Sequence, residues 1–343
     1  MGEISTIGLD LAKSVFQVHG VDAAGAVVLR RQLRRGQVKP FFEQLSPCLV
    51  GMEACPSAHY WARELSALGH AVRIMPAHYV KAYVKRGKND AADAGAICEA
   101  VARPSMRFVA TKSAEQQAVM VLHRTRSLLV RQRTMLVNAL RGHLAEFGIT
   151  AAVGRQGVSA LLSILQDPQE ERLPALARSC LLGLARSLEQ LQGELDQLEQ
   201  RLQACHRSDP DSRRLESIPG LGPVASTALR AAIGDGSQFR SGREFAAWVG
   251  LVPRQNSTGG KARLGRICKQ GDGYLRWLLV AGAMAVIRHH RRKGASGNPW
   301  LDDLLARKPA KVVAVALANK NARIAWALLR SGERYRRPDP TLA

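Results

Sequence analysis

The sequence predicts an α/β domain at the N-terminal end, a helical middle region and a mostly α-helical C-terminal region. Short apolar runs between turn residues predict the first, a leucine repeat of helical period predicts the second, and glycine-rich turns between helical stretches predict the third. The 343 residues are enough for two domains with proper cores. We place the region bounds at 1–110, 111–210 and 211–335, with a frayed tail at 336–343.

The first 110 residues alternate between predicted strands and helices. Gly69 closes one helix, Pro76 ends the last strand, and the last helix stops before Pro104. Three antiparallel strands followed by alternating helices and strands is the element order of the ribonuclease H-like fold, in which acids cluster at the centre of the sheet. Strands are expected at 4–10, 15–21, 26–33, 48–53 and 71–75, and helices at 37–46, 57–69 and 90–102.

Four acidic residues occupy positions in this pattern where a nuclease would need them. Asp10 and Glu53 each end an apolar run, whereas Asp90 and Asp93 lie three residues apart and share one face of a helix. Carboxylates at strand ends that face a helix-borne pair can hold two divalent metal ions, Mg²⁺ or Mn²⁺, against a phosphodiester. In a chain of net charge +22, few uncompensated acids should cluster unless a cation joins them.

Each of these residues also has a purely structural interpretation. The two strand-end acids could cap turns, Asp90 could be a helix N-cap, and Asp93 could be a first-turn acid that complements the helix dipole. Lys13 and Lys88, which lie beside the acids in sequence, could reach the oxygens of a scissile phosphate or could simply be solvated. The spacing alone leaves both interpretations open.

The charge of the chain favours a polyanionic partner. Lys and Arg number 50 against 28 Asp and Glu, and the predicted pI is about 10.6. Residues 211–343 carry 24 of the basic residues and 9 of the acidic ones, so this third is expected to provide the main phosphate-binding surface. A basic membrane-surface protein is the alternative, but no amphipathic Lys/Arg helix flanked by exposed aromatic residues supports it.

A leucine seam marks the helical middle region. Seven leucines recur at gaps of three and four residues, with Glu and Gln between them, which is the period of a coiled coil. A single amphipathic helix packed on its own domain could show the same pattern. The seam consists of Leu181, Leu184, Leu188, Leu191, Leu195, Leu198 and Leu202.

The C-terminal region combines a helix-hairpin-helix pattern with a basic, glycine-rich loop. In residues 218–229, Gly220 and Gly222 permit a tight turn before a helix whose free amides can hold a phosphate. An ordinary turn between helices is the alternative. The basic residues expected to contact nucleic acid are Arg254, Lys261, Arg263, Arg266 and Lys269.

Four tryptophans on apolar helical stretches (Trp248, Trp277, Trp300 and Trp326) are expected in the core.

The cysteine pattern and hydropathy suggest the compartment. Six cysteines are scattered without a Cys-x-x-Cys pair or a Cys/His ligand spacing, which disfavours a zinc site and suits a reducing cytoplasm. No export signal is recognisable near Met1, and no apolar run approaches the ~20 residues that a membrane helix needs. We therefore expect a cytoplasmic protein with no membrane partner.

Over nearly its whole length, the chain resembles the DEDD transposases of a large bacterial insertion-sequence family, the bridge-RNA-guided serine recombinases. The matching N-terminal motifs are Gly8-Leu9-Asp10-Leu11-Ala12-Lys13, Gly51-Met52-Glu53 and Lys88-Asn89-Asp90-Ala91-Ala92-Asp93-Ala94. The matching C-terminal motifs are Ile218-Pro219-Gly220-Leu221-Gly222-Pro223, Gly250-Leu251-Val252-Pro253, Ser257-Thr258-Gly259-Gly260-Lys261 and Ile267-Cys268-Lys269-Gln270-Gly271-Asp272.

The resemblance implies a RuvC-like domain, a coiled-coil insertion and a small transposase domain with a nucleophilic serine. It also implies a noncoding bridge RNA that pairs with donor and target DNA, leaving the protein to read shape and backbone. The family's serine stands just before Gly-Gly-Lys, often within a Ser-Ser or Ser-Thr pair. We assign it to Ser257, the only serine in the loop; if the reactive position is the second of the pair, Thr258 would have to serve.

The function expected from the resemblance is cutting and rejoining of DNA by an oligomer, because recombination must hold two duplexes. A dimer or a tetramer is expected. One alternative is a metal-dependent junction nuclease that uses water, with Ser257 as a loop residue or helix cap. Another is a non-catalytic nucleic-acid scaffold. Acids at all four positions argue against the scaffold, and the Ser-Thr-Gly-Gly-Lys loop favours the recombinase.

Overall fold

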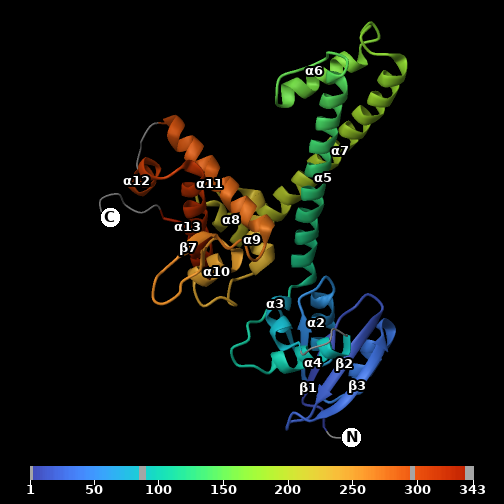
Figure 1. The fold of residues 1–343 in the computed structure, drawn as a ribbon, viewed down its shortest axis with the longest axis vertical. Helices are drawn as coiled ribbons and strands as arrows, with labels where there is room; N and C mark the ends of the chain where they lie inside the picture. Colours follow the sequence, from blue (N-terminus) through green and yellow to red (C-terminus); the bar gives the residue numbers. More distant parts are fainter. Residues whose placement is uncertain (1–2, 85–89, 294–297, 337–343) are drawn as a thin grey trace. The chain divides into compact units, whose positions relative to one another are not determined.

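The computed structural model describes residues 3–84, 90–293 and 298–336. Contacts divide the chain into two compact units (Figure 1). The N-terminal unit contains residues 1–117 together with 236–240, and the C-terminal unit contains 118–235 together with 241–343.

The N-terminal unit is built on a five-stranded mixed sheet in the order β3-β2-β1-β4-β5. The first three strands pair antiparallel, and β4 and β5 continue the sheet in parallel with β1. The strands are β1 (Thr6–Asp10), β2 (Val15–Val21), β3 (Val27–Arg34), β4 (Leu49–Glu53) and β5 (Ala71–Met75). Each expected strand is present, with bounds shifted by two residues at most.

Helices cover both faces of this sheet. On one face, Ile7 and Leu9 of β1 are buried with Phe42 of α1 (Val38–Glu43) and Leu65 of α2 (Ala58–Ala67). On the other face, α4 (Asp90–Val101) packs against β1, β2 and β4. The short elements of this unit are η1 (Arg35–Gln37), α3 (Ala77–Val80) and η2 (Lys81–Tyr83). The side chains of residues 6 to 9 of β1 thus point alternately to the two faces of the sheet, and helices cover both faces.

A long antiparallel pair of helices runs through the middle of the chain. Arg126 and Arg133 of α5 (Ala114–Ala145) contact Glu199 at 2.7 Å and Gln192 at 3.2 Å on α7 (Ala175–Ser208). The order of these contacts shows that the two helices run in opposite directions. The helix α6 (Arg155–Gln166) packs against the C-terminal end of α5 and the N-terminal end of α7.

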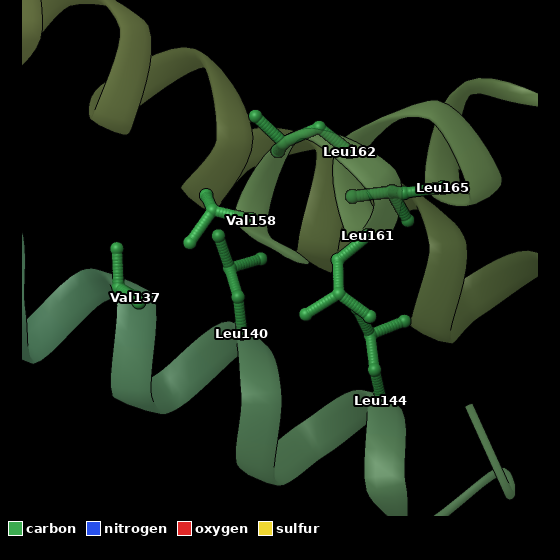
Figure 2. A pocket seen from close by; sticks show the side chains of 7 residues that line it. All are labelled: Val137, Leu140, Leu144, Val158, Leu161, Leu162 and Leu165. Carbon is green, nitrogen blue, oxygen red and sulfur yellow. The ribbon is translucent and has the colours of Figure 1, made fainter. Parts of the chain in front are cut away.

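Figure 2 shows how α5 and α6 pack together at this end. Leu140 and Leu144 of α5 face Leu161 and Leu165 of α6, and all four side chains are buried. The space that the surrounding side chains enclose is too small to admit a water molecule. This end of the helical region is therefore a closely packed apolar core.

The leucine seam packs inside the chain. Leu181 and Leu188 belong to the apolar core of α5 and α6, and Leu195 and Leu202 are each 1% exposed. The remaining seam leucines are buried or half-buried. The seam therefore has partners within its own chain, and its pairing with a second subunit stays a prediction.

The rest of the C-terminal unit consists of helices packed around the apolar helix α13 (Ala310–Ser331). Its helices are α8 (Pro210–Glu216), α9 (Pro223–Ile233), α10 (Gly242–Val249), α11 (Gly273–Lys293), α12 (Pro299–Arg307) and α13 (Ala310–Ser331). A two-stranded hairpin of β6 (Pro253–Gln255) and β7 (Leu264–Ile267) lies between α10 and α11 in sequence.

By length and composition, α13 is a candidate membrane span, which the sequence analysis did not foresee. Half of its most apolar window is buried inside the protein, where α13 packs against α8, α10, α11 and α12. Lys320 and Arg323 interrupt its apolar residues in the sequence. These contacts identify α13 as the central helix of the C-terminal unit.

The expectation for Trp277 was wrong, because this side chain on α11 is 57% exposed.

Candidate functional site

Two glycines on neighbouring strands allow α4 to lie directly on the sheet. Gly8 of β1 and Gly51 of β4 are register partners. A Cβ atom on Gly8 would lie 2.1 Å from the carbonyl oxygen of Ala94, and one on Gly51 would lie 2.7 Å from the Cβ of Val101. A larger side chain at either position would force α4 away from the strands. We call Gly8 and Gly51 the glycine pair.

Asp10 and Glu53 lie on the same face of the sheet as the glycine pair, the face that α4 covers. Asp10 and Glu53 each lie two residues after a glycine of the pair, and side chains two residues apart on a strand point to the same face. Asp93 precedes Ala94, the α4 residue whose carbonyl covers Gly8. Strand register and helix packing therefore direct three of the four predicted acids to one edge of the sheet.

The pKa of Glu53 shows that these acids interact. Burial raises this pKa above its ordinary value, and the negative charges of Asp10 and Asp93 raise it further. All three residues are half-buried. Because like charges disfavour ionisation only at short range, the three carboxylates share one electrostatic environment. We call them the carboxylate cluster.

The chemistry of the carboxylate cluster fits a hard divalent cation. Carboxylate oxygens are the ligands that Mg²⁺ prefers, and a positive ion would relieve the repulsion that raises the pKa of Glu53. Among residues 3–84, 90–293 and 298–336, no three acidic, His or Cys side chains already converge as a ligand set. Asp90 begins α4, but its side chain lies outside the described residues, as does Lys88. Lys13 is exposed after β1.

Ser257 lies in the exposed loop of the β6–β7 hairpin. Its Oγ accepts a hydrogen bond from the backbone N–H of Arg263 at 3.1 Å and another from Nε2 of Gln255 at 3.2 Å. Within the described part of the chain, the Ser257 hydroxyl donates to no acceptor. Two donors thus point at the oxygen, while its own proton stays available. Ser257 closes a hairpin loop and caps no helix.

The tip of this loop is a tight turn built on two glycines. Gly259 and Gly260 both have positive φ, at 55° and 76°, and the N–H of Lys261 donates to the carbonyl of Thr258 at 3.1 Å. Positive φ at both central residues is the requirement of a type I′ hairpin turn, which glycine meets without strain. The Gly-Gly pair of the sequence motif is therefore explained by local geometry.

The base of the hairpin is held by close backbone contacts. A Cβ atom on Gly250 would lie 2.2 Å from the carbonyl oxygen of Gln270, and one on Gly271 would lie 1.8 Å from that of Trp248. Arg276 donates to the Gln270 carbonyl at 3.0 Å. The loop thus projects an exposed tip from a fixed base.

Basic side chains surround the hairpin. Arg254, Lys261, Arg263, Arg266 and Lys269 are all exposed. None of these five forms an ion pair with a carboxylate among the residues that the structure describes. They are the residues that the sequence analysis expected to contact nucleic acid, and the structure gathers them on or beside one hairpin.

The predicted helix-hairpin-helix segment forms a turn between α8 and α9. Gly220 has φ of +94°, and a Cβ atom there would lie 2.9 Å from the Gly282 carbonyl oxygen of α11. Gly222 is the N-cap of α9 and has open space beside it. Gly220 is therefore required for packing on α11, whereas the surroundings of Gly222 can admit a ligand.

Two features of this site escaped the sequence analysis. The glycine pair had a visible signal, since both strand-end motifs read glycine, apolar residue, acid, with the glycine two residues before the acid. Gln255 had no such signal, because its role depends on the hairpin that brings it to Ser257.

A second arrangement resembles a hydrolytic triad but is structural. His206 contacts Ser212 Oγ at 2.8 Å through Nδ1 and Glu216 at 2.9 Å through Nε2. Ser212 is completely buried, so no substrate can reach its hydroxyl. These bonds join the end of α7 to α8.

Comparison with known proteins identifies the family. Residues 212–297 match the family described as "Transposase IS116/IS110/IS902 family", and residues 7–149 match a DEDD transposase family described as "Transposase". These segments contain the hairpin with Ser257 and the carboxylate cluster, respectively.

Relatives match over almost the whole chain. A "Probable family 20 transposase" of Pseudomonas aeruginosa is 56% identical over 97% of this chain and 99% of its own length. The transposase for insertion sequence element IS1328 of Yersinia enterocolitica is 39% identical over 97% and 98%. The transposase for IS1111A of Coxiella burnetii is 39% identical over 98% and 92%. The chain therefore belongs to the IS110/IS116 family of DEDD transposases, enzymes that act on DNA.

Proposed function

We propose that this transposase cuts and rejoins DNA strands with Ser257 as the nucleophile. The observation that carries the proposal is the pair of N–H donors, from Arg263 and Gln255, that point at Ser257 Oγ. An N–H donor stabilises negative charge on oxygen, so these contacts lower the cost of forming an alkoxide. The exposed loop leaves room for a phosphodiester to approach.

The proposed reaction conserves the energy of each broken bond. As the Oγ–P bond forms, the P–O bond to one DNA segment breaks, and the proton released by Ser257 ends on the departing DNA hydroxyl. A hydroxyl of the new DNA partner then attacks the phosphoserine, and Ser257 recovers a proton. Two reversible steps replace a single exchange.

The carboxylate cluster supports metal assistance of this chemistry. Asp10, Glu53 and Asp93, together with Asp90, would hold Mg²⁺ or Mn²⁺. When bound, the ion supplies positive charge to the phosphate oxygens. The protein orients these carboxylates, because the glycine pair fixes the distance between α4, which carries Asp93, and the two strands that carry Asp10 and Glu53.

The main nucleic-acid-binding surface is assigned to the C-terminal unit. The five exposed basic residues at the hairpin would neutralise backbone phosphates. Gly222 and the α8–α9 turn would add backbone amides in the manner of a helix-hairpin-helix motif. Lys13 and Lys88 are proposed to contact the DNA beside the acids.

Several further properties follow from the same proposal. The strand order β3-β2-β1-β4-β5 and the position of the acids support a ribonuclease H-like, RuvC-like fold for the N-terminal unit. We infer a bridge RNA that selects donor and target DNA from the resemblance to guided recombinases. We also infer a cytoplasmic dimer or tetramer, with the α5–α7 pair acting as an antiparallel coiled coil.

Substitution of Ser257 tests the proposal. Protein with Mg²⁺, donor DNA and the flanking noncoding RNA should yield a covalent protein–DNA species. Ser257→Ala should abolish both that species and strand exchange, whereas Thr258→Ala, in the same exposed turn, should retain them. Cleavage by Ser257→Ala at the wild-type rate would show that water is the nucleophile, and the protein would then be a junction-type nuclease.

A further inference from the structure

A cavity of about 290 Å³ opens between α5, α9 and the start of α11 in the C-terminal unit. Its walls include the apolar side chains of Met120, Leu275 and Ala228. The volume lies at the lower end of the range for small-molecule pockets. It suits one planar ring system and is too small for a longer segment of chain.

The floor of this cavity, which we define as His123 and Tyr274, belongs to a chain of hydrogen bonds. His123 is 3% exposed, with Nε2 3.1 Å from Thr227 Oγ1 and Nδ1 3.1 Å from the hydroxyl of Tyr274. The Thr227 hydroxyl donates to the Pro223 carbonyl at 2.8 Å, so it accepts from His123. Nε2 therefore carries the proton, and Nδ1 accepts from Tyr274.

The floor is consequently uncharged. Burial, with a smaller effect from Arg126, lowers the pKa of His123 to about 4, so the imidazole is neutral near pH 7. Its two ring nitrogens are both occupied. The neutral imidazole of His123 and the phenol of Tyr274 favour an uncharged, flat ligand that can contact the Tyr274 ring.

The rim of the cavity carries positive charge. Arg124 and Arg131 are exposed, lie two helical turns apart on α5 and line the opening. Neither forms an ion pair with a carboxylate in the described part of the chain. Between rim and floor, Ser127 and Asp272 offer polar groups, and a carboxylate can accept a hydrogen bond from the amino group of a base.

We propose that this cavity binds a single unpaired nucleobase, with the adjoining backbone phosphates on Arg124 and Arg131. Neutral ring and anionic phosphate match the neutral floor and the cationic rim, respectively. Trp277 extends the aromatic surface to solvent, since its ring is nearly parallel to that of Tyr274, with centroids 6.1 Å apart. The proposal rests on the nucleic-acid function proposed above and adds a site for an unstacked nucleotide.

Photocrosslinking tests this site. The probes are duplexes with one 5-iodouracil, either unpaired in a bulge or paired, each made as DNA and as RNA. With the full-length protein, irradiation should join the bulged base to the peptide that contains Tyr274 and should leave the paired base free. The DNA and RNA probes show which kind of strand supplies the base.

Two cavity variants and one matched control variant complete the test. Ser127→Phe, which fills the cavity from the surface of α5, should weaken binding of the bulged probe by roughly tenfold. Arg124→Gln with Arg131→Gln should weaken it to a similar degree. Arg201→Gln with Arg207→Gln removes the same charge from exposed positions on α7 and should leave the crosslink intact.

The outcomes separate this proposal from the function on which it rests. Equal crosslinking of bulged and paired probes, or full crosslinking by both cavity variants, would overturn the nucleobase site while duplex binding persists. Loss of all nucleic-acid binding by the wild-type protein would overturn the proposed function as well.

Discussion

Ionisation of Glu53 lowers the stability of the folded protein. Its pKa is raised, first by burial and then by Asp10 and Asp93, so the folded protein binds this proton more tightly than the unfolded chain does. The contribution of Glu53 to stability is therefore most favourable below about pH 4.5, the ordinary value. It is lost as the pH rises through the raised pKa. The metal-binding role that we propose for Glu53 would explain why the protein keeps an ionisable group at this position.

We predict that Glu53→Gln stabilises the N-terminal unit while abolishing strand cleavage. Glutamine has a similar shape but cannot ionise, so it avoids the burial and repulsion that the carboxylate experiences. In urea unfolding with a chelator present, the variant should be more stable than wild type at pH 8, and the difference should shrink toward pH 4. Glu43→Gln, at an exposed position on α1, should show no such gain. Equal stability at both pH values would contradict the coupling of the three carboxylates.

The position of α4 on the sheet depends on the glycine pair. We predict that Gly8→Ala lowers the free energy of unfolding by about 1–3 kcal/mol, because its Cβ would overlap the Ala94 carbonyl and overpack the contact. Hydrogen exchange of α4 and β1 should increase, and cleavage should fall as Asp93 moves. Gly36→Ala has open space around it and should behave like wild type. Unchanged exchange in Gly8→Ala would show that α4 can shift without cost.

The same elements show what the sequence could predict. The strands of the N-terminal sheet and α4 follow from apolar runs bounded by glycine and proline, a local signal that tertiary contacts reinforce. Alignment of Asp10 with Glu53 followed from two strands of similar length ending in acids. The proximity of Asp93 to Glu53 depends on how closely α4 packs on the strands. The spacing of Asp90 and Asp93 in the sequence places them on one helix face but does not give that packing.

The strands of the hairpin that carries Ser257 could not be predicted from the sequence. The basic, glycine-rich stretch around Ser257 was expected to be a loop, whereas β6 and β7 pair on either side of this serine. Strands of three and four residues, almost fully exposed, have no apolar alternation to reveal them. Trp277 was misjudged for a related reason, since an apolar neighbourhood in sequence does not determine which side of a helix is covered.

Acidic and basic candidate residues belong to different units of the molecule. The carboxylate cluster belongs to the N-terminal unit, whereas Ser257 and its basic neighbours belong to the C-terminal unit. Of the 50 basic residues, 24 lie in residues 211–343, beside only 9 acidic ones. Such a distribution favours salt-dependent contacts with the phosphate backbone of nucleic acid.

We predict that Arg263→Gln, Arg266→Gln and Lys269→Gln together flatten the salt dependence of nucleic-acid binding. Each phosphate that the variant no longer neutralises should reduce the slope of log K against log salt by roughly 0.7–0.9, because fewer counterions are released on binding. The slope is measured by titration at several salt concentrations, with one DNA of fixed length.

A matched triple variant separates direct phosphate binding from net charge. Arg186→Gln, Arg201→Gln and Arg207→Gln remove the same charge from exposed positions on α7. If the hairpin residues contact phosphates, only the first triple changes the slope by the full amount, since charges beyond a Debye length of about 10 Å at 0.1 M salt are largely screened. Equal slopes for the two triples would show that overall charge, and not the hairpin surface, governs binding.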